Sequence, residues 1–149
     1  MIPANRRKIE KNALQQRRRR RGAEWENDLL EELNQMPQGW ACGLPKNWAG
    51  QPYDISAMIQ GQGLAIECKR IERGKLGYSA FTQNEREHLT RYEDAGGMAL
   101  VAIYRDSDQR RAFVPWYSVR NDILGGIRGS IDPMAYPEDL ADVWEVMHP

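Results

Sequence analysis

The sequence predicts a single α/β domain in which a mixed central sheet is flanked by helices. Three observations predict it. Residues 23–36 repeat apolar side chains at helical spacing, residues 53–71 have the pattern of paired strands, and residues 82–116 combine a capped helix with two strands. A chain of 149 residues suits one core. Its 41% hydrophobic and 28% charged residues exclude a disordered chain, and no apolar run approaches the roughly 20 residues of a membrane helix.

The first predicted helix, Ala23 to Met36, carries an acid on its apolar side. At about 100° per residue, its large apolar side chains fall within about 140° of arc. Glu26 falls inside this arc, whereas Glu24, Glu31 and Glu32 lie outside it. A carboxylate that faces the protein body is costly unless it is paired or bound. Glu26 is therefore a candidate functional residue.

The later elements are bounded by turn and capping signals. Thr82 and Glu85 have capping-box spacing, and Gly96-Gly97 is typical of a helix C-terminus. The almost continuous apolar run at 98–104 indicates a central strand buried on both faces. In chain order we predict a short irregular strand within 37–52, a hairpin of strands 53–59 and 64–71 around Gly61-Gln62-Gly63, a loop at 75–81, a helix from 82 to about 95, strands at 98–104 and 110–116, and a last helix from Pro137.

Basic side chains are concentrated at the N-terminus. Residues 1–21 hold nine of them against one acid, Glu10, so this segment carries +8 and the rest −8 of a net charge of zero. Like charges repel, so we expect a flexible, extended arm at 1–21 attached to one domain at 22–149. Its expected partner is a polyanion, bound through phosphate contacts; the alternative is a solvated or targeting-like arm without a specific partner. The candidate DNA-binding residues are Arg17, Arg18, Arg19, Arg20 and Arg21, continued by Arg70, Arg73 and Lys75.

The strand at 64–71 carries an acid and a base on one face. Period-two alternation places Leu64, Ile66 and Cys68 on one face and Ala65, Glu67 and Lys69 on the other. Asp54 stands near the start of the paired strand, where a hairpin brings it close to Glu67. Two converging carboxylates repel each other unless a cation lies between them, and oxygen ligands suit Mg²⁺ or Mn²⁺. Such an ion with a neighbouring lysine fits phosphodiester hydrolysis.

A simpler interpretation of this strand is a solvated sheet edge, because Glu-x-Lys is a common strand pattern. The surrounding arrangement favours the catalytic interpretation: Glu26 faces inward upstream, Asp54 precedes Glu67 in the hairpin, and a capped helix follows. Other sites have less support. Cys42 and Cys68 are too few for a disulfide framework, and with two histidines and no Cys-x-x-Cys a zinc site is not predicted. We expect reduced packing cysteines in a cytoplasmic protein.

Five short stretches in this order along the chain carry a resemblance to a known family: Arg21-Gly22-Ala23-Glu24-Trp25-Glu26, Pro52-Tyr53-Asp54, Ala65-Ile66-Glu67-Cys68-Lys69, Phe81-Thr82-Gln83 and Ala95-Gly96-Gly97. Through them the chain resembles the PD-(D/E)xK nuclease superfamily, and within it the small Holliday junction resolvases of the RecU and archaeal Hjc types. This resemblance implies a restriction-endonuclease-like core. The chain lacks the RecU stalk insertion and the serine that archaeal-type resolvases carry before the first metal ligand.

The resemblance implies a role for each matching polar residue. Asp54 and Glu67 would be metal ligands, helped by the carbonyl of Cys68, and Lys69 would stand at the attacking water. Glu26 would complete the acidic cluster, and Gln83 would brace the site. An ordinary polar position at a helix start is an equally good interpretation of Gln83.

The site residues predict a Mg²⁺- or Mn²⁺-dependent nuclease, and the resemblance implies a structure-selective DNA endonuclease of recombination and repair. The best match is a Holliday junction resolvase that acts as a homodimer, with apolar interface surface from the terminal helix or from Ala99 to Tyr104. Two alternatives stay open. One is a VRR-like or restriction-type nuclease acting on linear or flapped duplex. The other is a non-catalytic nucleic-acid-binding protein that uses the arm.

Overall fold

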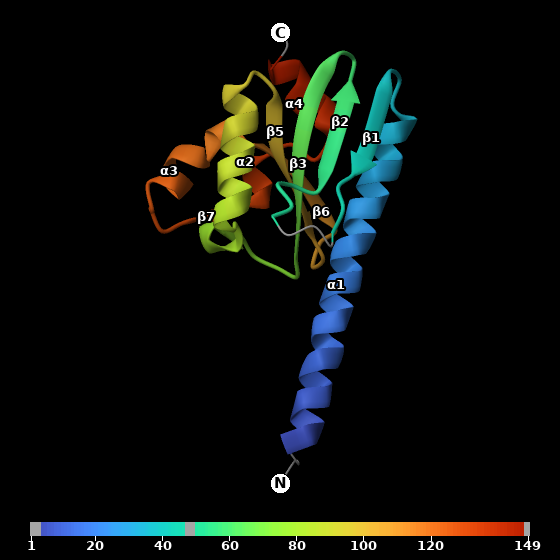
Figure 1. Ribbon diagram of the computed structural model, residues 1–149, viewed down its shortest axis with the longest axis vertical. Coiled ribbons are helices and arrows are strands. Elements are labelled where there is room, and N and C mark those ends of the chain that lie inside the picture. Colours follow the sequence, from blue (N-terminus) through green and yellow to red (C-terminus); the bar gives the residue numbers. More distant parts are fainter. Residues whose placement is uncertain (1–3, 47–49, 148–149) are drawn as a thin grey trace.

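The computed structural model describes residues 4–46 and 50–147 and shows a central sheet with helices on both faces (Figure 1). The sheet is mixed, as the sequence predicts. Across the sheet the strands are β1 (Gly39–Gly43), β2 (Ile55–Ile59), β3 (Gln62–Ile71), β5 (Met98–Arg105) and β6 (Arg110–Pro115). β1 pairs antiparallel with β2, β2 with β3, and β5 with β6, whereas β3 and β5 run parallel and are joined through α2 (Gln83–Asp94).

The β2–β3 hairpin turns one position earlier than the Gly61-Gln62-Gly63 pattern predicts. Ile59 pairs with Gln62, so the two-residue turn is Gln60-Gly61. Gln60 and Gly61 both have positive φ, at 49° and 82°. A two-residue turn with positive φ at both positions matches the twist of the strands. This turn fixes the register, which decides the faces on which the β3 side chains lie.

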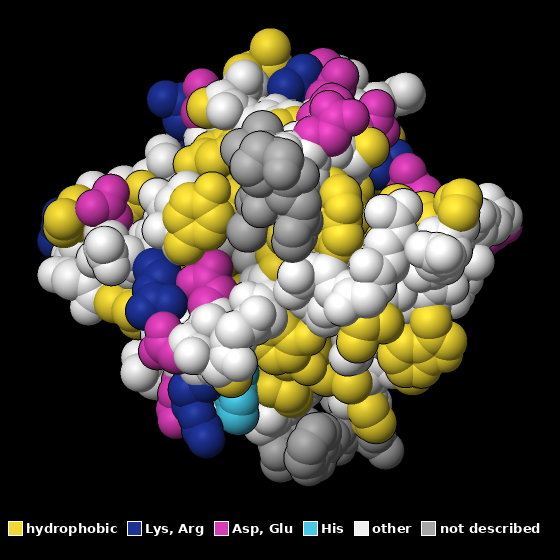
Figure 2. All heavy atoms as spheres, turned by 90° about the horizontal axis from the view of Figure 1, so that it is seen from above, with side chains coloured by type: hydrophobic (Ala, Val, Ile, Leu, Met, Phe, Trp, Pro, Cys, Tyr) yellow, Lys and Arg dark blue, Asp and Glu magenta, His cyan; other side chains and the backbone are white. Residues whose placement is uncertain are grey.

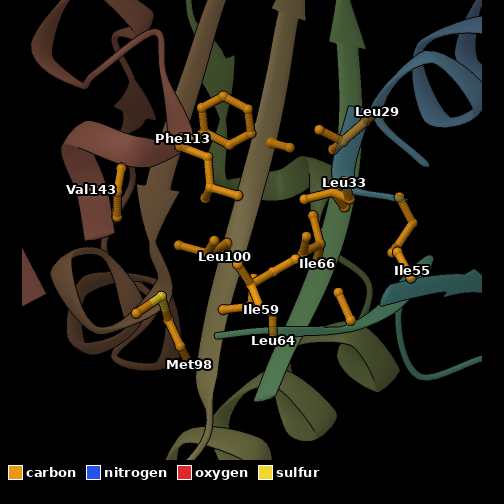
Figure 3. Close-up of a cluster of buried hydrophobic side chains, with 14 of the residues drawn as sticks. Leu29, Leu33, Ile55, Ile59, Leu64, Ile66, Met98, Leu100, Phe113 and Val143 are labelled. Atoms are coloured by element: carbon orange, nitrogen blue, oxygen red, sulfur yellow. The ribbon is translucent and has the colours of Figure 1, made fainter. Parts of the chain in front are cut away.

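Each face of the sheet has its own apolar cluster. On one face, Leu29 and Leu33 of α1 (Ala4–Gln35) and Val143 of α4 (Leu140–Met147) pack over Leu64 and Ile66 (Figure 3). On the other face, α2 and α3 (Arg120–Leu124) cover the strands. That second cluster includes Ala65, Leu89, Val101, Val114 and Ile123. The predicted alternation along β3 is therefore confirmed.

The extended arm predicted for residues 1–21 is wrong for residues 4–21, which form the first part of α1 (Figure 1). Residues 5–20 are exposed, and Arg21 is hydrogen-bonded to Arg70 of the body through its backbone carbonyl. The buried half of α1 supplies the helix nucleus, and adding residues to an existing helix needs no new nucleation. Arg, Lys, Gln, Ala and Leu, which dominate this segment, are good helix formers. Residues 1–3 lie outside the described residues.

Some elements have no clear sequence pattern. Short segments separated by loops form a second small sheet and several helical turns: β4 (Leu76–Gly77) pairs with β7 (Ser130–Ile131), and 3-10 turns lie at Tyr78–Ala80, Trp116–Ser118 and Pro133–Ala135.

The residues from Ala99 to Ile103 are fully buried, so the suggestion that this region offers an interface is wrong. None of the helices described is both long and apolar enough to cross a membrane.

The two ends of the molecule differ in surface chemistry. The end opposite the first half of α1 shows hydrophobic side chains across its centre, with Lys and Arg mostly toward its margins (Figure 2). Trp40 and Met58, which pair across β1 and β2, are 57% and 47% exposed. The basic half of α1 projects from the opposite end (Figure 1).

Candidate active site

Three charged residues are buried among those that the structure describes, and all three are acids predicted to be functional. Glu26, Asp54 and Glu67 have relative exposures of 7%, 8% and 5%. They come from α1, from the residue before β2, and from β3. Burying carboxylates is costly unless they are paired or bound. Their convergence is therefore the main feature of the site.

Hydrogen bonds to β3 fix the position of Asp54. Its backbone N–H donates to the carbonyl of Ile66 at 3.1 Å, which extends the β2–β3 ladder by one residue. Its Oδ2 accepts from the backbone N–H of Cys68 at 2.8 Å. The carboxylate of Asp54 is thus held against the strand that carries Glu67 and Lys69.

Lys46 lies between two of the buried acids. Its ammonium Nζ donates to Glu26 Oε2 and to Asp54 Oδ1, the latter at 3.0 Å. Burial lowers the pKa of Lys46, but its bonds to Glu26 and Asp54 outweigh burial and raise the pKa overall. Burial also raises the pKa of Glu26, with Asp54 adding to the effect and Lys46 opposing it. Lys46 therefore supplies positive charge to the acid pair.

The negative charge of Glu67 is compensated less by neighbouring groups than the charges of the other two acids. Burial raises its pKa well above the usual range, and the charges of Asp54 and Glu85 raise it further. Lys69 opposes this shift, with Nζ 3.5 Å from Glu67 Oε1. The same surroundings raise the pKa of the Cys68 thiol, first through burial and then through Asp54. Cys68 therefore stays a neutral thiol at neutral pH.

Lys69 is held by a residue that the sequence links only to helix capping. Its Nζ donates to Glu85 Oε1 at 2.9 Å and to the carbonyl of Ala80 at 3.0 Å. Glu85 also completes the capping box with Thr82. Burial lowers the pKa of Lys69, but Glu67 and Glu85 together raise it overall. Lys69 is thus a fixed, protonated ammonium group, unsuited to act as a general base at neutral pH.

The acids line a cavity of about 450 Å³ beside α1. Gly22 and Ala23 form part of its wall, and Arg19 lies at its edge, one helical turn before them. The remaining cavity residues are Glu26, also of α1, and Lys46, Asp54, Glu67 and Cys68 from other parts of the chain. The site is therefore bordered by carboxylates at its base and by an arginine of α1.

The donor set fits a hard divalent cation bound mainly by water. Within the described residues, no group of three or more Asp, Glu, His or Cys side chains is arranged to hold a metal ion. Asp54 lies close enough to Glu67 for its charge to raise the pKa of the Glu67 carboxyl group. Mg²⁺ typically uses one or two carboxylates and keeps several waters. This pair fits that requirement, whereas a full cage of protein ligands is not found in the described residues.

The other predicted site residues have different surroundings. Gln83 is exposed at the first position of α2, and no hydrogen bond joins its side chain to the site among the described residues. Arg70 connects the sheet to α1, donating to Asp106 at 2.7 Å and to the carbonyl of Arg21 at 2.6 Å. Arg73 and Lys75 are exposed. Cys42 is exposed as well, so the expectation that it packs in the core is wrong.

Lys46 and Glu85 are the site residues that the sequence does not reveal. Glu85 has a signal, the capping box, but that pattern says nothing about its second contact with Lys69. Lys46 lies in the irregular segment after β1, where no periodicity predicts the direction of a side chain.

No protein-family model matches the chain, and no curated protein sequence matches it. Among solved structures, the chain is similar to Hjc from Archaeoglobus fulgidus, a Holliday junction resolvase from an archaeal hyperthermophile. The TM-score is 0.61 and the sequence identity 26%, over 83% of this chain and 98% of that chain. The expected likeness to Hjc-type nucleases and the expected restriction-endonuclease-like fold are confirmed.

Proposed function

We propose that this protein is a metal-dependent, structure-selective DNA endonuclease, and specifically a Holliday junction resolvase that makes symmetric cuts by phosphodiester hydrolysis. The structural match to Hjc supports a junction-resolving nuclease. The observation that carries the proposal is the convergence of Glu26, Asp54 and Glu67, the three buried charged residues of the described chain, on one cavity. A purely structural sheet does not require three buried carboxylates in one place.

Asp54 and Glu67 are the proposed ligands of Mg²⁺ or Mn²⁺, with the backbone carbonyl of Cys68 as a further donor. When bound, such an ion polarises a phosphoryl oxygen and lowers the pKa of water. Lys46 bridges Glu26 and Asp54, because its ammonium group donates to both carboxylates. Glu26 thereby completes the acidic wall of the cavity. Because Lys46 already supplies a positive charge there, it competes with the ion for Asp54.

Lys69 acts as a fixed positive charge in this proposal. It keeps its proton at neutral pH, so it donates hydrogen bonds to the attacking water or to the phosphate and offsets the negative charge of the transition state. Glu85 and the carbonyl of Ala80 hold the ammonium group in place. The ammonium group then needs little reorientation during the reaction, and such preorganisation is the main source of electrostatic catalysis.

DNA is the proposed partner, and a homodimer is the proposed assembly. A four-way junction must be cut on two opposing strands, and a two-fold dimer with one site per subunit does this. Arg19 borders the cavity of the site. It is suited to hold a phosphate beside the scissile bond.

Cleavage of a synthetic four-way junction tests the proposal. Wild type and Lys69→Ala are compared with Mg²⁺, with Mn²⁺ and without metal, on the junction and on a linear duplex of the same sequence. We expect metal-dependent paired cuts in the junction by wild type, little cutting of the duplex, and no cutting by the variant.

Two results would contradict it. Equal rates on junction and linear duplex would replace the resolvase with a VRR-like or restriction-type nuclease. If neither substrate is cut, or if Lys69→Ala and Asp54→Asn leave cutting unchanged, the catalytic assignment fails and a nucleic-acid-binding role remains.

A further inference from the structure

The exposed half of α1 presents its charges in an ordered pattern. Arg7, Lys11, Arg18 and Arg21 recur at intervals of four, seven and three residues, which places them along one side of the helix. We call these four residues the basic stripe. At 1.5 Å per residue it is about 21 Å long, comparable to six base pairs of duplex DNA at about 3.4 Å each.

The basic stripe continues onto the body of the protein. Its last two members border a cavity of about 390 Å³ at the base of the helix. Arginines from α1 and from the end of β3 face this cavity together with two acids. These charged lining residues are Arg18, Arg21, Arg70, Arg73, Glu72 and Asp106.

Some of these guanidinium groups are paired. Asp106 bonds Arg70 at 2.7 Å and Arg21 at 3.4 Å, so one carboxylate fixes both. Arg18 and Arg73 make no ion pair within the described ranges 4–46 and 50–147. The cavity thus combines two arginines held in place with two whose charge is available to an anion such as a backbone phosphate.

The exposed half of α1 is poorly suited to a partner helix. Its large exposed apolar side chains are Ile9 and Leu14, at 68% and 38% exposure. They lie about 140° apart around the helix, so they form no apolar seam. The ion pair of Arg6 with Glu10 is the single acidic compensation recorded along residues 5–20. A polyanion is therefore the partner that this surface fits.

The direction of the helix is fixed by its other half. Trp25, Leu29 and Leu33 are at most 4% exposed and anchor α1 on the sheet. Arg70 and Asp106 hold the point at which the helix leaves the body. A continuous helix from Ala4 to Gln35 therefore carries the basic stripe at a constant orientation relative to the active site.

We propose that the exposed half of α1 is a rigid DNA-binding extension. The basic stripe lies along the phosphate backbone of one duplex arm, and the cavity at its base binds a phosphate of the same strand. The adjacent face of the helix, which carries Arg19, borders the active site. This inference rests on the proposed function, because it takes DNA as the substrate, and it adds which face of the helix meets the DNA.

A matched pair of triple variants tests it. Arg7→Ala, Lys11→Ala and Arg18→Ala remove three charges from the stripe. Arg6→Ala, Arg17→Ala and Arg20→Ala remove three charges over a similar length, from a face about 130° away. Both sets lie on exposed helix, and circular dichroism checks that helix content is unchanged. Binding to a short DNA duplex is measured by fluorescence anisotropy in EDTA over a range of salt, so that no cutting is involved.

We expect the stripe variant to lose at least about tenfold in affinity. The slope of log affinity against log salt should fall by about 2.7, which is 0.9 for each lost phosphate contact. The control should lose less than about threefold. Equal losses would overturn the proposal in favour of a flexible arm, and no loss in either, or a larger loss in the control, would also overturn it. Preference for a double-stranded RNA of equal length would overturn the choice of DNA.

The cleavage assay on the four-way junction separates this inference from the proposed function. If wild type makes paired cuts but the stripe and control variants lose DNA affinity equally, the protein is a nuclease and the rigid extension is wrong. If the stripe variant alone loses affinity but wild type does not cut, the rigid extension holds and the proposed nuclease function is wrong.

Discussion

The molecule has two regions of like charge, and the protein treats them in opposite ways. Glu26, Asp54 and Glu67 are brought together and buried, where burial, reinforced by the charge of Asp54, raises the pKa values of Glu26 and Glu67 and creates a need for cations. The arginines and lysines of residues 5–20 stay exposed along a helix, where water and salt screen them. Burial makes the first region sensitive to protons and metals, whereas exposure makes the second sensitive to salt.

The largest expected effect separates cutting from binding at the buried region. Asp54→Asn should reduce the cleavage rate at saturating DNA by at least about 10³-fold, because it removes a charge needed in the transition state. DNA affinity in EDTA should stay the same. The matched control is Glu87→Gln, an exposed acid of α2, which should leave both quantities unchanged. Equal loss of binding and cutting in Asp54→Asn would mean that the two regions are not separate.

Shortening the exposed region should have the reverse effect. Deletion of residues 1–16 removes Arg7 and Lys11 of the basic stripe, so the salt slope of DNA binding should fall by about 1.8, which is 0.9 for each lost phosphate contact. Affinity should fall by about tenfold at low salt, and the difference from wild type should disappear at high salt. Cutting at saturating DNA should persist. A salt-independent loss of activity would show that the helix supports the site instead of the DNA.

Lys46 provides a smaller test of charge compensation. Lys46→Met leaves Glu26 and Asp54 without their shared cation, so the Tm in EDTA should fall by about 3 °C, as about 1 kcal/mol does in a domain of this size. Mn²⁺ should then raise the Tm more than in wild type, with about tenfold tighter apparent binding. Lys75→Met, an exposed lysine outside the cavity, is the control. An unchanged response to Mn²⁺ would contradict competition between Lys46 and the metal.

The smallest effect concerns protons. Because the folded-state pKa of Glu67 is raised, the folded state binds more protons than the unfolded state, and stability falls as pH rises from the usual carboxyl range through that raised pKa. Glu67→Gln should remove this loss and raise the Tm in EDTA at neutral pH by about 3 °C. The difference should vanish in acid. Thermal unfolding across pH measures it, and a variant less stable than wild type at neutral pH would refute the assignment.

Residues in regular elements could be predicted from the sequence. Glu26 follows from helical phase and Glu67 from strand alternation, since those two periods determine where side chains point. Lys46 lies in an irregular segment, where direction depends on backbone angles that no pattern encodes. The first part of α1 was not predicted for another reason: local charge repulsion disfavours it, and the packed half that stabilises it lies further along the chain.

The placement of the charged helix also affects how the molecule moves before it binds. A chain with no net charge feels no overall pull toward a polyanion, yet this one carries +8 at one end and −8 over the rest. Because the positive end is held out on a continuous helix, the separation gives the molecule a large electric dipole (Figure 1). In the field of DNA that dipole experiences a torque, which turns the helix toward the duplex during diffusion and favours productive collisions.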